Sequence, residues 1–203
     1  MDFKSLKSKK PAIIGVTLVV IVLGFSKCFS GENTKIKSLA EAIKLCVPYK
    51  TGEKSSKAST TKNISYCQEA LKMVQNNTDI SNDERNRLNA RFRLYLADSY
   101  IISFRQTHSQ IEKQEASKIL HDLVLDLTNQ KNKIDLEIIM ADNYSSDDWR
   151  REILGQVLFE LACSCMVGNE TKAYLQKAAE FGNQKAQEKL IDFNPSMCQT
   201  PKN

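Results

Sequence analysis

Seven glycines and four prolines in 203 residues are too few to punctuate a chain of short strands. A β-protein of this length needs turn residues about every eight to twelve positions. Leucine, alanine, lysine, glutamate, glutamine and isoleucine together make up almost half of the chain. All of these except the β-branched isoleucine lose little conformational freedom in a helix. We therefore expect an all-α fold in which helices joined by short loops pack as antiparallel neighbours.

Apolar residues recur at helical spacing through most of the chain after residue 35. The expected helices are Ile36–Cys46, Ile64–Val74, one that begins after Ser81 and carries Tyr100, Ile111–Leu127, Trp149–Met166, Lys172–Phe181 and a last one that ends near Phe193. Ser81 and Glu84 form a capping box at the start of the third helix. The segment Pro48–Lys62 is rich in Lys, Ser and Thr, which predicts a mobile loop. Ile134–Met140 is apolar enough for a strand, but nothing else in the chain would pair with it.

The helix predicted at Trp149–Met166 is apolar nearly all the way round. Such a helix is covered on every side in a folded domain, so we expect it at the centre. Trp149 is the only tryptophan of the chain. We expect its side chain in the core, and the alternative is an anchor that lines a groove for a partner.

The first thirty residues have the composition of an export signal. Met1–Lys10 is basic, Ala12–Phe25 carries no charge over fourteen residues, and Ser26–Ser30 is more polar. This is the order of regions in a secretory signal. Fourteen helical residues span about 21 Å, which is short of a hydrocarbon core of about 30 Å. We expect a signal peptide or signal-anchor at residues 1–30 and a helical-repeat domain at residues 31–203.

The membrane segment allows three interpretations. Cleavage after Ser30 would use Cys28 and Ser30 as the small residues of the processing site. A retained anchor would extend to Phe29 and let Lys27 reach the interface. Bacterial lipidation of Cys28 is the third, and Lys27 beside it fits that chemistry poorly. In the first two the basic start stays in the cytoplasm and the body is exported.

The positive charge is concentrated in the export segment. The chain has 29 basic and 24 acidic residues, of which residues 1–30 hold five lysines and one aspartate. The remainder has 24 basic and 23 acidic residues, a net charge of +1. A body with so little net charge and no basic stripe lacks the field that gathers polyanions. We expect no nucleic-acid partner.

One segment resembles a known repeat. Residues 161–168 read LACSCMVG and residues 178–187 read AAEFGNQKAQ. Together they resemble the Sel1-like repeat, a helix pair related to the TPR, in which L-G is followed six residues later by Gly and then by A-A-E-x-G-N-x-x-A. The alanines let two helices approach closely, and the glycines end helices in the left-handed conformation. The structural positions of the motif are Gly168, Ala173, Ala178, Ala179, Gly182 and Ala186.

The segment also departs from the repeat. Ala162 stands in place of the usual glycine, Cys165 in place of an aromatic residue, and the connection from Gly168 to Ala173 is short. A second clear copy at a fixed period is missing from the sequence. The resemblance implies a short, irregular TPR/Sel1-like superhelical array, with a non-repetitive helix bundle as the alternative. Families with this resemblance mostly bind another protein or a peptide.

An exported chain can form disulfides. Cys46 closes one predicted helix and Cys67 opens the next, so we predict a Cys46–Cys67 bridge. Cys198 could reach back to Cys163 or Cys165, which are otherwise small core residues. Cys163 and Cys165 are two positions apart on a helix and point to different faces, which argues against a shared metal.

The sequence shows no catalytic, cofactor or metal motif. The two histidines, His108 and His121, have no set of ligands around them, and Asp147-Asp148 suits a helix N-terminus. We expect an exported protein-binding scaffold of the cell envelope that is not an enzyme and holds no cofactor. The alternatives are a membrane-anchored subunit of a secretion-type machine and a cell-wall-acting enzyme or its regulator.

The expected location is the bacterial periplasm, or the inner membrane with the body facing the periplasm. The alternative is a secreted protein or one that uses the eukaryotic secretory route. Four Asn-x-Ser/Thr sequences keep that route open, at Asn63, Asn76, Asn143 and Asn169.

Overall fold

The computed structural model describes residues 38–47, 57–131, 133–135, 138–139, 148–164 and 170–194. All of them belong to the unit Ile36–Asn203, while Met1–Lys35 forms a separate unit. Within these ranges the regular structure is entirely helical, which confirms the all-α prediction. The predicted signal segment, with Cys28 and Ser30, lies outside the described residues. None of the helices in the ranges above is long and apolar enough to cross a membrane.

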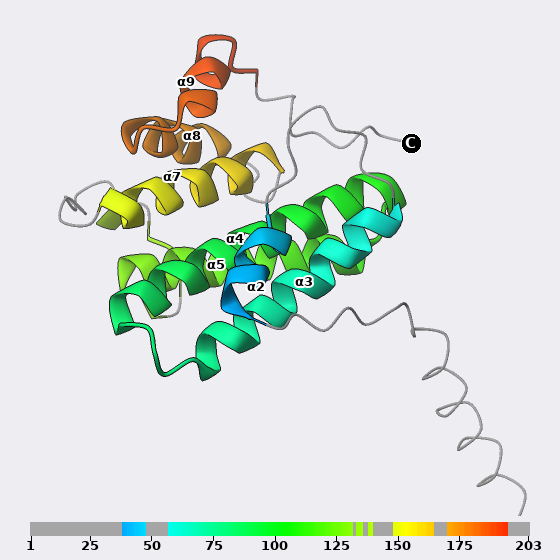
Figure 1. Cartoon of the computed structure of the whole chain (residues 1–203). Coiled ribbons are helices and arrows are strands. Elements are labelled where there is room, and N and C mark those ends of the chain that lie inside the picture. The colour runs from blue at the N-terminus through cyan, green and yellow to red at the C-terminus, as the bar shows by residue number, and fades with distance from the viewer. Residues whose placement is uncertain are drawn as a thin grey trace, which may run out of the picture. The chain divides into compact units, whose positions relative to one another are not determined.

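The helices follow the predicted order with shifted bounds. They are α2 Leu39–Leu45, α3 Lys57–Asn76, α4 Asn82–Thr107, α5 Gln110–Thr128, α7 Asp148–Cys163, α8 Thr171–Glu180 and α9 Gln184–Ile191 (Figure 1). Each packs on the described helix before it in the chain, and α4 also packs on α7. In Figure 1, α7, α8 and α9 lie in that order on one side of α4 and α5.

Helix α4 stands between two apolar clusters. One face contributes Leu88, Phe92 and Leu96 to a cluster with α2 and α3. Another contributes Ala90, Leu94, Ala97 and Ile101 to a larger cluster with α5, α7, α8 and α9. Residues three or four apart share a helix face, so these two sets lie on different sides of the helix. Helix α4 is therefore covered on two sides, and its polar residues lie on the two flanks between them.

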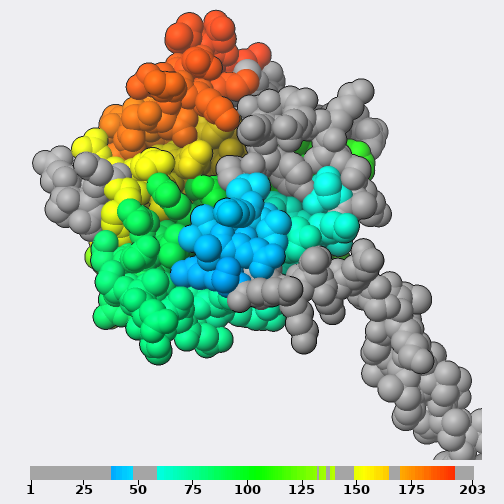
Figure 2. Space-filling view, viewed as in Figure 1, coloured from blue at the N-terminus to red at the C-terminus, as the bar shows by residue number. Residues whose placement is uncertain are grey.

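The predicted disulfide is present. Cys46 follows α2, Cys67 lies within α3, and their Cα atoms are 4.7 Å apart. Both residues are completely buried, together with Ala42, Ala70 and Val74 of the same cluster. In the space-filling view, α2 lies over α3 and α4 (Figure 2). The bridge therefore fixes a short helix that would otherwise have little area to hold it.

The predicted loop at Pro48–Lys62 is wrong in its second half, because α3 already begins at Lys57. Some polar residues at the start of this helix face the interior of the fold, although Thr61 and Lys62 are exposed. Thr60 and Asn63 are buried, and the Asn63 side-chain amide donates to the Val47 carbonyl at 3.2 Å and to Ser99 Oγ at 2.7 Å. Polar groups that are bonded inside a protein are compatible with a packed helix face. Asn63 is thereby enclosed, whereas Asn76 at the end of α3 is exposed.

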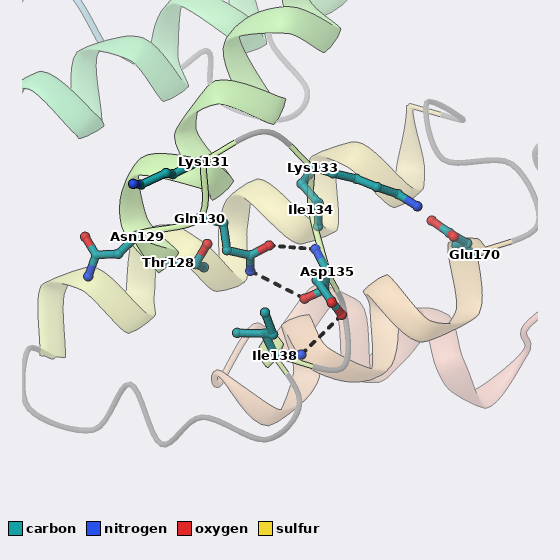
Figure 3. Close-up of a pocket in the computed structure, with 9 residues that line it drawn as sticks. All are labelled: Thr128, Asn129, Gln130, Lys131, Lys133, Ile134, Asp135, Ile138 and Glu170. Carbon is teal, nitrogen blue, oxygen red and sulfur yellow. Dashed lines mark hydrogen bonds between the residues drawn. The ribbon is translucent and has the colours of Figure 1, made fainter.

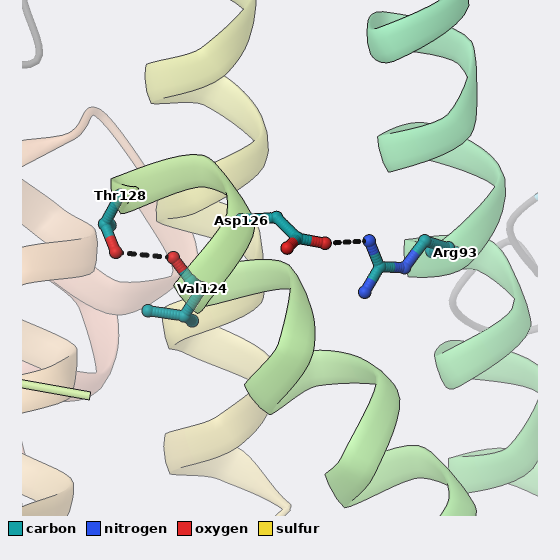
Figure 4. A network of polar contacts seen from close by, with 4 residues as sticks. All are labelled: Arg93, Val124, Asp126 and Thr128. Atoms are coloured by element: carbon teal, nitrogen blue, oxygen red, sulfur yellow. Dashed lines mark hydrogen bonds and ion pairs between the residues drawn. The ribbon is translucent and has the colours of Figure 1, made fainter. Parts of the chain in front are cut away.

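Side chains hold both ends of α4. At its start, Ser81 Oγ accepts from the Glu84 amide at 3.2 Å, which is one of the two bonds of the predicted capping box. At the other end, His108 ends α4 in the left-handed conformation, with φ of 56°. The hydroxyls of Ser103 and Thr107 both donate to the Glu112 carboxylate. Further along, Arg93 of α4 pairs with Asp126 of α5 (Figure 4).

Helix α7 is the central helix that its sequence predicts. Ile153, Leu154, Val157 and Leu158 are each at most 2% exposed. A Cβ atom at Gly155 would lie 3.0 Å from Phe181 Cβ, so this glycine lets the end of α8 approach α7 closely.

The residues of the repeat motif lie on α8, α9 and the turn between them. Gly182 ends α8 with φ of +87°, and the amides of Gly182 and Asn183 return to Ala179 and Ala178 at 3.0 Å. Ala178 and Ala186 are completely buried, whereas Ala173 and Ala179 are only partly buried. Gly168 lies outside the described residues.

Candidate functional site

Charged residues occupy one of the two flanks of α4 between the apolar clusters. Arg91, Asp98 and Arg105 are seven residues apart, or about two helical turns each, so they line up along one side. This is the side on which α4 meets α7. A line of charge on a contact face is unusual, because buried charges are costly unless they are paired.

Helix α7 supplies two acids to the same seam. Glu152 pairs with Arg91, with 3.6 Å between Oε2 and Nη2. Two turns further along, Glu160 meets Asp98 of α4, and their carboxylates repel each other electrostatically. Arg105 of α4 and Lys185 of α9 act on both carboxylates as neighbouring positive charges.

The two acids hold their protons more tightly than free carboxylic acids do. Burial raises the pKa of Asp98 well above its usual range and the Glu160 carboxylate raises it further, against the smaller effects of Lys185 and Arg105. Burial also raises the pKa of Glu160, while Arg105 and Lys185 lower it. Asp98 Oδ1 is enclosed and accepts no hydrogen bond within the described structure. The pair therefore ionises with difficulty.

Next to this pair is a hollow of about 500 Å³ between α4, α7, α8 and α9. We call it the α4/α7/α9 groove, after the helices that carry its charges. Its lining residues are Arg105, Phe159, Glu160, Ala162, Cys163, Thr171, Leu175, Lys185, Lys189 and Phe193. Phe159, Ala162 and Leu175 are buried and form its floor, whereas the three basic residues are exposed and stand around it.

The basic residues of the groove form no direct ion pair in the described part of the chain, although Arg105 and Lys185 lie near enough to Asp98 and Glu160 to act on their carboxylates. Among the described residues, Arg105, Lys185 and Lys189 take part in no ion pair, in contrast to Lys177, whose Nζ lies 2.9 Å from Glu180 Oε2. Lys185 and Lys189 are four residues apart on α9 and so lie on one face of it. The groove therefore combines an apolar floor with three exposed basic residues and one acid whose pKa is raised by burial.

A second hollow, of about 660 Å³, lies beside the segment that follows α5 (Figure 3). Its polar groups hold the segment itself: the Asp135 amide donates to Gln130 Oε1 at 2.6 Å, and Gln130 Nε2 donates to the Asp135 carbonyl at 3.4 Å. Asn129 begins this turn in the left-handed conformation, with φ of 55°. Because these contacts close the turn, we regard the hollow as a product of the loop and not as a binding site.

The predicted site residues are distributed unevenly. Cys163 lines the groove and Ala186 is a buried residue of α9, while Cys165 and Cys198 lie outside the described residues. Trp149 is partly buried against the main apolar cluster, with the Arg150 guanidinium 5.5 Å from its ring centre. It is not among the residues that line the groove.

Sequence reasoning missed Asp98, Arg105, Glu160 and Lys185. Two signals were available for the first three, and none for Lys185. Arg91, Asp98 and Arg105 repeat at intervals of seven on a helix with apolar residues on both sides. Glu160 is the one charged residue between Ile153 and Cys163, a stretch of α7 that is otherwise apolar or neutral. Each signal marks a charge that must be accommodated inside the protein.

Within the described ranges, no three or more His, Cys, Asp or Glu side chains come together in a group that could hold a metal ion. The chemistry that the groove offers is ionic and apolar contact. Comparison with known protein families, curated proteins and solved structures gave no match for this chain.

Proposed function

We propose that this chain is an exported protein-binding scaffold and that the α4/α7/α9 groove receives a segment of its partner. One observation supports this above the others: three cations without an ion pair in the described structure surround an apolar floor. Charged groups left unpaired around an apolar hollow are suited to a ligand that supplies the missing contacts. The helices would form a short, irregular TPR/Sel1-like array, with α4, α7 and α9 as its inner helices.

Export is part of the proposal. The Cys46–Cys67 disulfide indicates an oxidising compartment, as found in the periplasm or outside the cell. The basic and apolar start of the chain supports the same route. The bacterial periplasm, or the periplasmic face of the inner membrane, is the proposed location.

A peptide display library screened against the full chain tests the binding function without assuming a ligand. Peptides that bind the groove should lose about tenfold in affinity with Phe193→Ala, since an aromatic contact in a groove contributes about 1–2 kcal/mol. The matched control is Ile191→Ala at the end of α9. Ile191 is 81% exposed and does not line the groove, so this change should leave affinity intact.

The two variants must first give the same circular dichroism spectrum and the same melting temperature as the native chain. Equal binding by native protein and Phe193→Ala would then contradict the groove as the binding surface. An enzyme acting on cell-wall material is the competing function. Turnover of such material by the full chain, abolished by one substitution in the groove, would replace the scaffold proposal.

Whether the scaffold is released or anchored is decided by N-terminal sequencing of native material. A start at Gly31 identifies a released protein, which salt should wash from membranes. An intact start at Met1 or Asp2, with release only by detergent, identifies the membrane-anchored subunit of a larger envelope machine.

A further inference from the structure

The charges of the α4/α7/α9 groove restrict the chemistry of its occupant. Arg105 enters from α4, and Lys185 and Lys189 enter from α9, so positive charge faces the hollow from two helices. The carboxylate that lines the same hollow is Glu160. Counting the ionised groups, the lining carries three positive charges and at most one negative charge.

The Glu160 carboxyl group is also harder to ionise than a free carboxylic acid. Burial raises the pKa of Glu160, and the neighbouring Asp98 shares the same enclosed seam. A protonated Glu160 would leave the groove with its full positive charge and would present an O–H donor. A cationic ligand would meet three like charges there, and a neutral one would make no ionic contact with Arg105, Lys185 or Lys189.

Resting on the proposed function, we infer that the groove binds an acidic segment of a partner protein whose apolar side chain enters between Phe159, Leu175 and Phe193. Carboxylates of the segment would pair with Arg105, Lys185 and Lys189 at the edge of the hollow. Lys185 and Lys189 lie on one face of α9, so both can pair with acidic side chains of a peptide that lies along this face. The apolar contact supplies affinity, and the charges select the partner.

Fluorescence anisotropy with two labelled peptides of equal length tests the inference on the full chain. One alternates leucine with glutamate, and the other alternates leucine with glutamine. The native protein should bind the glutamate peptide at least about tenfold more tightly, with an affinity that falls as salt is added. Equal affinity for the two peptides, or no binding of either, would overturn the inference.

Charge-reversal variants test whether the two lysines of α9 contact the peptide. The double change Lys185→Glu with Lys189→Glu should weaken binding of the glutamate peptide about tenfold or more. Lys172→Glu is the matched control, because Lys172 is an exposed lysine of α8 outside the groove lining. An equal loss in the control, or none in the double variant, would mean that net charge or another surface is responsible.

Glu160→Gln gives a readout that damage to the fold would not mimic. The charged groups that face Glu160 are Asp98 and Arg105 from α4 and Lys185 and Lys189 from α9, while α8 contributes Thr171 and Leu175 to the lining there. Removing its charge should strengthen binding of the glutamate peptide at about pH 8 and flatten the gain that the native protein shows on acidification. Weaker binding by this variant would contradict the inference.

An anionic amphiphile such as a fatty acid offers the same combination of charge and apolar surface. Laurate, kept below its micelle concentration, is the competing probe. Saturable binding of laurate with no binding of the glutamate peptide would replace the partner segment by a lipid. Display peptides that bind through Phe193 but carry no acidic residues would keep the proposed function and reject the acidic partner alone.

Discussion

Asp98 and Glu160 are two enclosed acids that the overall composition of the chain gives no reason to single out. Both acids lie in a seam between α4 and α7, and Asp98 Oδ1 accepts no hydrogen bond among the described residues. An enclosed carboxylate of this kind costs stability when it is ionised, because no donor replaces the water it has lost. The protein keeps the pair at the edge of its groove in spite of that cost.

The cost gives a pH-dependent prediction for Asp98→Asn. A carboxyl whose pKa is raised by folding binds its proton more tightly in the folded state, so the native chain loses stability as pH rises above the unfolded pKa of about 4. The variant should be more stable than the native chain near pH 8, and the two should converge near pH 4. Urea unfolding at both pH values measures this. A variant that is less stable at pH 8 would show that the ionised carboxylate has partners that stabilise it.

The chain at the end of α8 needs a left-handed backbone conformation, and Gly182 adopts it. Its φ of +87° is one that residues with a Cβ atom adopt at a cost, although the space around it is open. Gly182→Ala should therefore lower the unfolding free energy by about 1 kcal/mol, and Gly182→Asn should lower it by less. Thermal unfolding of both variants checks the order. Equal stability of the alanine variant and the native chain would contradict the requirement.

At the scale of elements, the disulfide between α2 and α3 is the best-defined long-range link in the first half of the body. It joins Cys46 to Cys67 across 21 residues, and both are buried. Replacing both by alanine should cost about 3 kcal/mol of unfolding free energy in the chain-entropy account. Reduction of the native chain should cost a similar amount, and a reductant should not affect the variant. Mass mapping that finds both residues as thiols in native material would refute the bridge.

Periodicity predicted the helices well where one apolar face decides the structure. The core helix α7 and the helix α5 end within a few residues of their predicted bounds, because each buries a long apolar stripe. It failed at the start of α3, where Thr60 and Asn63 are buried polar residues with partners on other segments. Those partners, Gln106 and Ser99, lie on α4 and are more than thirty residues away in sequence. Local composition cannot identify such pairs.

At the scale of the whole body, the groove is a product of packing. It needs α4, α7, α8 and α9 in one place, and Arg105 and Lys185 are eighty residues apart in the chain. Helical patterns indicate which face of each helix is buried, but not which helices share a hollow. Trp149, for which the sequence left open a role as an anchor in a partner groove, packs against the main cluster and is not part of the groove lining.

The central claim is that a partner segment binds in the α4/α7/α9 groove, and amide hydrogen–deuterium exchange of the full chain tests it most directly. The exchange is compared with and without the glutamate peptide, on the native chain and on the Lys185→Glu, Lys189→Glu variant. We expect slower exchange at α9 and at the end of α7 in the native chain, and no change in the variant. Protection confined to α2, α3 or α5, or equal protection in the variant, would contradict the claim.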